Sequence, residues 1–181
     1  MQFRPTSIDG FVIVELDPIE DERGAFVRTF CEREFRSAGI GFNVVQANLS
    51  LNTHRHTLRG LHFQEPPFGE PKIVSCTKGR IFDVAVDLRP DSETYLEWKG
   101  VELGAETGRM VYLAEGLAHG FLTLEAESQI HYLMGAEYRP EQARGLRWDD
   151  PALAIAWPAP PAVISERDST YPLLLYPSAD A

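Results

Sequence analysis

The chain has 181 residues, of which 44% are hydrophobic and 24% are charged, and its formal net charge is −10 at pH 7. This composition predicts one compact domain, residues 1–181, with a hydrophobic core. The negative charge argues against a general nucleic-acid-binding surface and against an anchor for anionic membranes, although a local basic pocket can still hold a small anion.

The start of the chain, MQFRPTSIDGFVIVEL, lacks the basic start and long apolar run of a secretory signal. No window approaches the roughly 20 apolar residues of a membrane span. We therefore expect a soluble cytoplasmic protein. Cys31 and Cys76 lie far apart without a CxxC pattern, so we expect two buried, small hydrophobic side chains and neither a disulfide scaffold nor a cysteine-based zinc site.

Runs typical of β-strands recur through most of the chain. They are rich in Val, Ile, Phe, Leu and Tyr, and Gly, Pro, Asp or Asn separates them at short intervals. This pattern predicts an antiparallel β-sandwich or barrel. In chain order the runs are GFVIVEL, GAFVRTF, FNVVQANLSL, TLRGLHFQ, KIVSC, RIFDVAVDL, LEWKGVEL, RMVYL, GFLTL and SQIHYLM.

The segment CEREFRSAGI is the one long helical pattern, with Phe35 placed to pack and Gly39 as its C-cap. A further short turn is expected after RPEQARG. The core is predicted to span about residues 10–158. Residues 159–181 are proline-rich with few periodic runs, so we expect an irregular C-terminal tail that packs over the barrel and frays after about Tyr176.

Strict alternation sorts the side chains of RIFDVAVDL into two faces, one of which carries two aspartates. The acidic face is either solvated, as in an ordinary antiparallel strand, or it lines a barrel that is apolar at depth and polar at its mouth. The neighbouring runs favour the barrel interior, because Lys72 and Tyr132 also fall on otherwise apolar faces. The two faces are Phe82, Val84, Val86 and Leu88, and Ile81, Asp83, Ala85 and Asp87.

Several titratable side chains on these runs can carry acid–base chemistry. A histidine can accept a proton and a phenol can deliver one, so a base and an acid on separate strands can flank a substrate. A cation between them can stabilise negative charge on an oxygen. Taken singly, a strand histidine or a buried tyrosine is more often structural. The candidates are Arg59, His62, Lys72, Asp83, His119, Tyr132 and Asp168.

The segment His54–His56 reads HRH, a spacing that puts two imidazoles on one strand face, and His119 follows in EGLAHGF. This arrangement resembles the two halves of the metal-binding pattern of many small cupins. The glutamate expected four or five residues after the HxH is absent, because Gly60 and Leu61 stand there. We therefore expect no metal ion.

From about Asp21 to Asp168, the sequence resembles the nucleotide-sugar 3,5-epimerases typified by dTDP-4-dehydrorhamnose 3,5-epimerase. The resemblance implies an all-β, cupin-type jelly roll with one or two short helices, a homodimer, and activity without metal or organic cofactor. The motifs that carry it, in the same order, are DERGAFVRTF, QANLS, LRGLHFQEPP, PKIVSCTKGRIFDVAVDLRPDSETY, EGLAHGF, EYRPEQARGLRWDDPALAIAWP and ISERD.

The same resemblance implies a substrate and a reaction. The substrate is a 4-keto-6-deoxyhexose on a nucleoside diphosphate, with dTDP as the nucleotide expected first, and it is inverted at carbons 3 and 5. A proton next to a ketone can be removed only if the enolate oxygen is stabilised while the base takes it. Reprotonation on the opposite face then inverts the carbon.

Matched motif by motif, His62 in LHFQ resembles the proton acceptor and Tyr132 in IHYLM the proton donor. Asp168 in SERD resembles the carboxylate that orients the imidazole, and Lys72 in PKIV the lysine that stabilises the enolate or binds substrate. Arginines suit the diphosphate because a guanidinium can bind phosphate oxygens in a bidentate way. The substrate-binding positions are matched by Arg23, Gln46, Asn48, Arg59, His119 and Arg167, with Asp83 as a supporting group at the same polar mouth.

Some positions depart from the family pattern near the site. Arg28 replaces a typical glutamate, Met134 replaces a typical lysine, and Pro71 directly precedes Lys72. LAEGLAHGF lacks the usual proline before EG, and the loop NLSLNTHRHTLRG is unusually basic. The acid, the base and the orienting carboxylate all remain, so these departures bear on which sugar is used and whether both carbons are inverted.

Three alternatives fit the same residues. One is a 3-only or 5-only epimerase of another deoxysugar pathway. A second is a ketoisomerase of the same barrel type, which shares the enolate but does not need the Tyr132 acid. A third, of a different class, is a non-catalytic sugar-nucleotide or metal-binding cupin, which only the histidine-rich loop supports.

The run TLRGLHFQ poses a geometric problem, because strict alternation points Arg59 and His62 to opposite faces. Both can serve one substrate if the strand breaks its period at Gly60, through a bulge or twist. Alternatively, Arg59 sits at the strand's entrance and reaches round the rim to the diphosphate. The sequence therefore predicts irregular pairing near Gly60.

Overall fold

The structure is a computed structural model that describes residues 1–174. The fraying expected after Tyr176 lies outside the described residues. Within residues 1–174, no helix has the length and apolar character that crossing a membrane requires.

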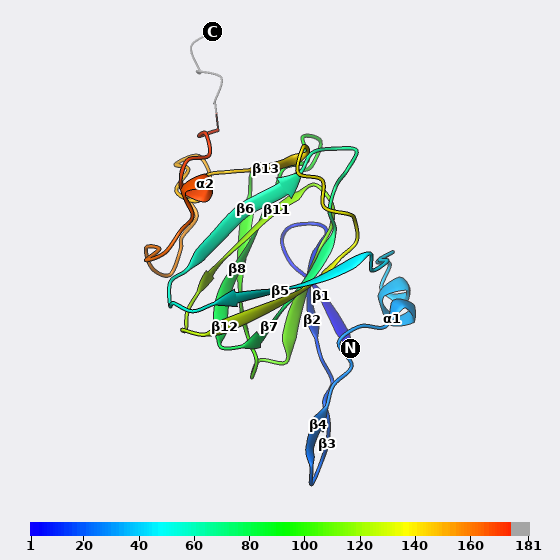
Figure 1. Ribbon diagram of the computed structural model, residues 1–181. Coiled ribbons are helices and arrows are strands. Elements are labelled where there is room, and N and C mark those ends of the chain that lie inside the picture. The colour runs from blue at the N-terminus through cyan, green and yellow to red at the C-terminus, as the bar shows by residue number, and fades with distance from the viewer. Residues whose placement is uncertain (175–181) are drawn as a thin grey trace.

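Two antiparallel sheets pack face to face (Figure 1). From β5 onward the chain passes repeatedly between the sheets, which is the connectivity of a jelly roll. The predicted all-β jelly roll with two short helices is therefore confirmed. The six-stranded sheet has the order β1 (Gln2–Pro5), β2 (Phe11–Glu15), β10 (Arg109–Leu113), β7 (Lys72–Lys78), β12 (Ser128–Met134), β5 (Gln46–Asn52). The five-stranded sheet has the order β13 (Ala143–Gly145), β6 (Leu58–Gln64), β11 (Leu117–Thr123), β8 (Arg80–Asp87), β9 (Trp98–Gly104).

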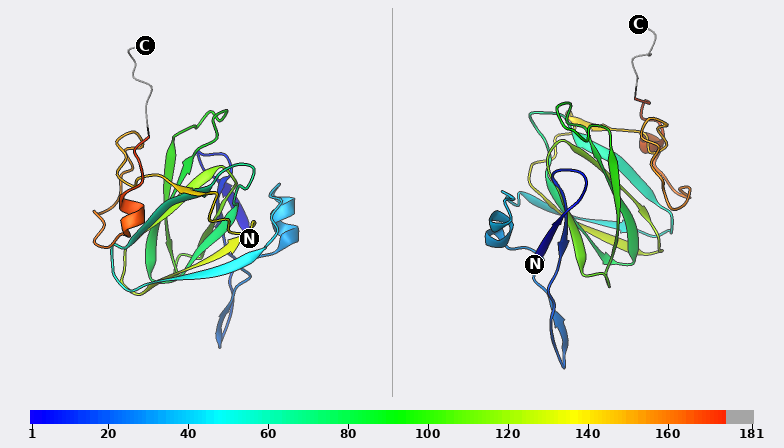
Figure 2. Two further views of the ribbon diagram at one scale, coloured as in Figure 1. Left: turned by 45° about the horizontal axis from the view of Figure 1, so that its top comes forward. Right: turned by 180° about the vertical axis from the view of Figure 1, so that it is seen from behind.

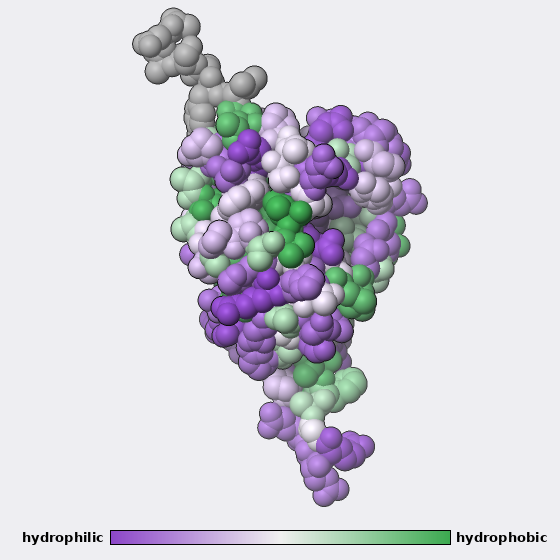
Figure 3. All heavy atoms as spheres, turned by 60° about the vertical axis from the view of Figure 1, so that its left-hand side comes forward, coloured by the Kyte–Doolittle hydropathy of each residue, from purple (hydrophilic) through white to green (hydrophobic). Residues whose placement is uncertain are grey.

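A separate hairpin of β3 (Ile19–Asp21) and β4 (Gly24–Phe26) projects away from the sandwich (Figures 1 and 2). Its two strands pair only with each other. The side chains of Ile19 and Phe26 are 70% and 72% exposed. Figure 3 shows apolar residues where the hairpin leaves the body and polar residues at its tip. This hairpin therefore adds little to the core of its own chain.

The inward faces of the two sheets form the main core. Ile81 and Ala85 of β8 lie in this core, and Asp83 and Asp87 on the same face are fully buried. The interpretation of this acidic face as solvated is therefore wrong, and the interpretation as barrel interior is confirmed. Asp87 is satisfied by Arg89, Ser92 and Thr94 in the following turn.

The outer face of β8 is also covered. Val84 and Val86 pack with Leu146 and Leu153 of the C-terminal segment, against which Trp157 also packs. A segment with proline breaks can follow the sheet surface without forming its own ladder, and this explains why the tail lacks periodicity. The predicted tail, residues 159–181, begins after these side chains, so its packing over the barrel stays a prediction. The turn expected after RPEQARG is present, at residues 148–149 and 151–153.

The two short helices lie on opposite sides of the sandwich (Figure 2). α1 (Glu32–Ser37) is shorter than the predicted segment; Ala38 is its C-cap and Gly39 follows with a φ of +81°. Phe35 is fully buried against the six-stranded sheet, a burial that contributes about 1.5–3 kcal/mol. α2 (Glu166–Ser169) lies in the tail. Of the two free cysteines, Cys76 is buried as predicted, whereas Cys31 is only half-buried.

The pairing of β6 with β11 is irregular at Gly60, as predicted. His119 pairs with His62 and Phe121 pairs with Arg59, so two residues of β6, Gly60 and Leu61, oppose the single residue Gly120. Gly60 has a φ of +120°. The extra residue shifts the period of the strand. As a result, Arg59 and His62 line the same groove.

We expect Gly60→Ala to lower the free energy of unfolding by about 1–3 kcal/mol more than Gly24→Ala does. A Cβ on Gly60 would lie 2.5 Å from the Cα of Gly120 and 2.8 Å from the carbonyl oxygen of His119. Gly24 has a similar φ of +123°, but nothing lies within 4 Å of the added Cβ. Urea unfolding of the two variants measures the difference, and equal losses would contradict the close approach at the bulge.

Candidate active site

The first element of the site is a hydrogen-bonded histidine–aspartate pair between β6 and α2. His62 Nε2 lies 2.8 Å from Asp168 Oδ1, and the Gly60 N–H donates to Asp168 Oδ2 over 3.1 Å. The imidazole is half-exposed and Asp168 is buried. The bulge therefore places His62 beside Asp168 and also provides the Gly60 N–H that donates to the Asp168 carboxylate.

The tail positions α2 beside β6. Val163 pairs with Thr57 in a parallel bridge, and the Val163 carbonyl accepts from the Leu58 N–H over 2.8 Å. Ser165 then caps the helix by accepting from the Asp168 N–H over 3.1 Å. These contacts fix where Asp168 meets His62.

Burial raises the pKa of Asp168, but the hydrogen bond and charge of His62, with the Gly60 N–H and Ser165, outweigh it and hold that pKa below its usual value. Asp168 is therefore a carboxylate at neutral pH. A carboxylate at this position can stabilise an imidazolium on His62.

A second histidine–aspartate pair lies on the neighbouring strands. His119 Nε2 on β11 is 2.7 Å from Asp83 Oδ2 on β8, and both side chains are buried. The other oxygen of Asp83, Oδ1, is buried without a hydrogen-bond partner among the described residues. Since His119 and His62 are partners in the β-ladder, the two imidazoles come from adjacent strands.

Tyr132 lies on β12, in the opposite sheet from both histidines. Its ring meets that of His119 edge to face, with the centroids 6.0 Å apart. Burial, and then the negative charge of Asp83, raise the pKa of Tyr132 despite the opposing effect of Arg59. Tyr132 is therefore a protonated phenol at neutral pH, able to donate a proton.

Lys72 opens β7, next to β12. Its Nζ lies 2.8 Å from Glu70 Oε2, and the two side chains are 6% and 10% exposed. Met134 of β12 is the ladder partner of Lys72. Glu70 was not among the residues singled out from sequence, and its only signal was its position two residues before Lys72.

One cavity of about 470 Å³ is lined by the two histidines, Tyr132, Lys72 and Glu70. An adjoining groove of about 400 Å³ shares His62 and Arg167 with it and adds Arg59 and Asp168. The cavity also exposes residues that the sequence analysis missed, among them Glu70, Tyr138 and Arg144. The predicted residues that line the cavity itself are Gln46, Asn48, His62, Lys72, His119, Tyr132 and Arg167.

The cationic side chains at the rim are held by neighbours. Arg59 Nε donates to Asn52 Oδ1 over 2.8 Å. The Arg167 guanidinium lies 5.7 Å from the ring centroid of Tyr171, and hydrogen bonding to Tyr138 raises the pKa of Arg167. The Tyr171 ring in turn meets the His62 ring edge to face at 6.3 Å.

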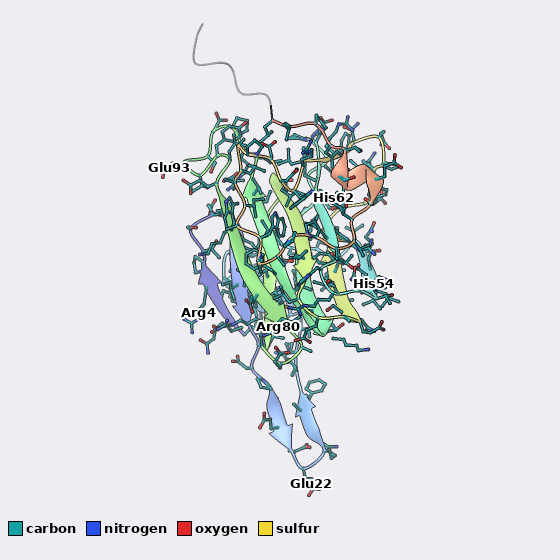
Figure 4. The ribbon with its side chains drawn as sticks, turned by 90° about the vertical axis from the view of Figure 1, so that its left-hand side faces the viewer. Arg4, Glu22, His54, His62, Arg80 and Glu93 are labelled. Atoms are coloured by element: carbon teal, nitrogen blue, oxygen red, sulfur yellow. The ribbon has the colours of Figure 1, made fainter. Side chains whose placement is uncertain are left out.

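Two predicted site residues line neither the cavity nor the groove: Asp83 is buried behind His119, and Arg23 lies well away from both. Arg23 is 84% exposed in the β3–β4 hairpin and pairs with Asp21 at 2.6 Å. Its neighbour Glu22 lies at the hairpin tip, at the opposite end of the molecule from His62 (Figure 4). Within one chain, Arg23 therefore does not join the other predicted residues.

The histidine-rich loop is also separate from the cavity. His54 is exposed and His56 adopts a φ of 59° in the turn before β6, and Figure 4 shows His54 apart from His62. No group of three or more His, Cys, Asp or Glu side chains in residues 1–174 is arranged to hold a metal ion.

Comparison with known proteins places this geometry in a family. The family described as dTDP-4-dehydrorhamnose 3,5-epimerase matches residues 5–175. The chain belongs to this family. Its members are carbohydrate epimerases, and the cavity with its histidine, lysine and tyrosine is the place in this chain where such chemistry can occur.

Individual relatives support the family assignment. The dTDP-4-dehydrorhamnose 3,5-epimerase of Sinorhizobium fredii is 44% identical over 96% of this chain and 90% of its own length. A dTDP-4-dehydrorhamnose 3-epimerase of Streptomyces niveus is 39% identical over 100% of this chain and 87% of its own. The crystal structure of the 3,5-epimerase of Bacillus anthracis, with TDP and PPi bound, has a TM-score of 0.93 at 34% identity, covering 96% of this chain and 99% of that one.

We expect Asp168→Asn to lower the free energy of unfolding by about 1–3 kcal/mol at neutral pH, because it removes a buried, charge-assisted hydrogen bond. The pKa of Asp168 is lower in the folded protein than in the unfolded chain. The ionised carboxylate therefore adds to the free energy of unfolding above the unfolded pKa of about 4, and this stabilisation is lost as the pH falls through the folded-state pKa. Urea unfolding from pH 7 to acid should show the gap between wild type and variant closing below about pH 4.

The matched control is Asp149→Asn. Arg147 lowers the pKa of Asp149 as well, but this pair is on the surface, so solvent screening leaves it worth little. A pH-independent loss of stability in Asp168→Asn would contradict the ionised pair.

Proposed function

We propose that this protein is a cofactor-independent epimerase that inverts carbons 3 and 5 of a 4-keto-6-deoxyhexose attached to dTDP. The observation that carries the proposal is the position of a carboxylate-backed histidine and a protonated phenol on opposite sheets of one cavity. A sugar ring between the sheets meets a base on one side and an acid on the other.

In this mechanism, the His62 imidazole takes the proton from the carbon next to the ketone. The electrons of the C–H bond move to the ketone oxygen, and the Lys72 ammonium stabilises the resulting enolate. Tyr132 then delivers its proton to the same carbon from the opposite side, which restores the ketone and inverts the centre. Asp168 stabilises the charged His62 until its proton returns to solvent, and solvent returns a proton to the Tyr132 phenolate.

The nucleotide end of the substrate is assigned to the cationic rim. Arg59 and Arg167 lie beside His62 in the adjoining groove, and their guanidinium groups suit a diphosphate. Gln46 and Asn48 at the cavity wall can bind the base or the sugar. A local cluster of this kind attracts an anionic ligand even though the chain carries a net charge of −10. The TDP and PPi bound to the Bacillus anthracis relative support dTDP as the nucleotide.

A 3-only epimerase is the second candidate. The Streptomyces niveus relative carries the name 3-epimerase and matches the whole of this chain. Inversion at one carbon needs the same base and acid, and differs only in which carbon approaches His62. The product stereochemistry decides between these two candidates.

We also infer a homodimer in which the hairpin of one chain reaches the cavity of the other. β5 is an edge strand of the six-stranded sheet, and Leu49 and Leu51 on it are 54% and 61% exposed. An open, apolar edge favours pairing with another strand. The projecting β3–β4 hairpin offers Ile19 and Phe26 for this edge. If the hairpin docks on the partner's β5, Arg23 comes close to the end of the cavity that Gln46 and Asn48 line in the other chain. This arrangement would explain why Arg23 lies far from the cavity of its own chain.

The function is tested by incubating the protein in D₂O with a panel of dTDP-linked and other 4-keto-6-deoxy sugars. We expect deuterium at carbons 3 and 5 and inverted products whose carbonyl stays at carbon 4. His62→Ala should lower deuterium incorporation by about 10²- to 10⁴-fold, because it removes the base. Tyr132→Phe should retain exchange but lose inversion.

Each result has a contrary outcome. Full exchange in His62→Ala would move the base elsewhere, and a fully active Tyr132→Phe would refute the phenol as donor. A product with its carbonyl at carbon 3 would identify a ketoisomerase. Inversion at carbon 3 alone would identify the 3-only epimerase.

The dimer is tested by light scattering of wild type and Phe26→Asp. We expect a mass of two chains for wild type and of one chain for the variant, because a charge replaces an apolar contact. Tyr95→Asp is the control, since Tyr95 is 47% exposed and lies outside the hairpin and β5. In the dimer, Arg23→Ala should raise KM with little effect on kcat. A monomeric wild type with full activity would contradict the inference.

A further inference from the structure

The Lys72 ammonium is almost completely removed from solvent, and one carboxylate pairs with it. Its Nζ lies 2.8 Å from Glu70 Oε2, and the two side chains are 6% and 10% exposed. Within residues 1–174, Glu70 is the only carboxylate at ion-pair distance from Lys72. Both side chains also line the cavity.

The surroundings of Lys72 provide no second anion. Its ladder partners, Leu113 on β10 and Met134 on β12, are buried and apolar. The buried carboxylates of Asp83 and Asp168 are each paired with a histidine. The titratable and charged groups that face the cavity from the other elements are His62, His119, Tyr132, Tyr138, Arg144 and Arg167.

Local sequence explains why this pair forms. A residue that precedes proline is confined to extended conformations, so Pro71 holds Glu70 extended. In an extended segment, residues two apart point to the same side. The Pro71 carbonyl is itself fixed by the Gly135 N–H at 2.8 Å. Glu70 is thus directed into the cavity beside Lys72.

An ammonium that is buried without a counter-charge loses its proton more readily, because the low-dielectric surroundings disfavour the charged form. A neutral amine can stabilise an enolate oxygen far less than an ammonium can. An ammonium has three N–H donors, and the bond to Glu70 uses one, which leaves two for a ligand oxygen.

We propose that Glu70 is a positioning residue that supplies the counter-charge of Lys72 and directs its ammonium into the cavity. The proposal deepens the function proposed above and rests on it for the role of Lys72 at the enolate. The new element is that the reaction needs the negative charge of Glu70. Glu70 affects the reaction only through Lys72 and does not contact the reacting carbons.

The protonation of Lys72 can be measured without any substrate. The chain contains three lysines, Lys72, Lys78 and Lys99, and the latter two are exposed. Labelling with ε-¹³C-lysine therefore gives three signals, and Lys72→Arg identifies the one that belongs to Lys72. We expect its titration midpoint to fall by about one pH unit or more in Glu70→Gln, which is at least a tenfold loss of proton affinity.

Two variants control the experiment. Glu70→Asp keeps the charge and should retain most of the wild-type midpoint. Glu115→Gln removes a carboxylate from an exposed residue that packs beside Gly69 in the adjoining loop, and it should leave the midpoint unchanged. A cooperative urea unfolding transition like that of wild type reports that each variant is folded. A fall of less than about half a pH unit in Glu70→Gln would overturn the proposal.

Kinetics connect the measurement to the reaction. In Glu70→Gln, the alkaline limb of the kcat profile for deuterium exchange should move to lower pH by the same amount, with KM little changed. A uniform loss of rate at every pH would overturn the proposal, because it indicates a merely structural role. If wild type exchanges no proton in any sugar of the panel, the proposed function fails, whereas the lysine titration still decides whether Glu70 controls the charge of Lys72.

Discussion

The site depends on the place where β6 gains one residue against β11. Gly60 and Leu61 together face Gly120, and the shift in period brings Arg59 and His62 to one groove. The same Gly60 donates its N–H to Asp168, the carboxylate that orients His62. One backbone irregularity therefore positions the proposed base, its partner and a rim cation at once. Only a residue without a Cβ fits there, because the neighbouring strand approaches so closely.

The mouth of the barrel holds several ionisable groups, and each is balanced locally. Asp168 and Asp83 each accept from a histidine, and Glu70 accepts from Lys72. Buried charges persist only when they are paired in this way. The two sheets thus present separate chemistry, with histidines on one and a phenol and an ammonium on the other, while the arginines remain at the rim.

Local periodicity explains how much of this could be predicted from the sequence. The alternation in β8 correctly put Asp83 with Ile81 and Ala85, and the groupings of Lys72 and Tyr132 with apolar neighbours also agree with the core. A conflict between period and chemistry in TLRGLHFQ correctly located the bulge. Two features could not be predicted from periodicity: Cys31 is half-buried where burial was expected, and α2 forms in a tail that has no periodic signal of its own.

The sequence by itself determined the strands, their inward faces, and which side chains are candidates for base, acid and cations, because side-chain alternation and chemical type are properties of short segments. Only the tertiary structure decided which groups meet. Asp168 reaches His62 from more than a hundred residues away in the chain through the pairing of Val163 with Thr57. Arg23 is carried away from the cavity by its hairpin, and Glu70 becomes the counter-charge of Lys72 only because the strands around them remove both from water. Burial and strand register depend on contacts between segments that are distant in the sequence, and these contacts decide which reactive side chains lie together in one site.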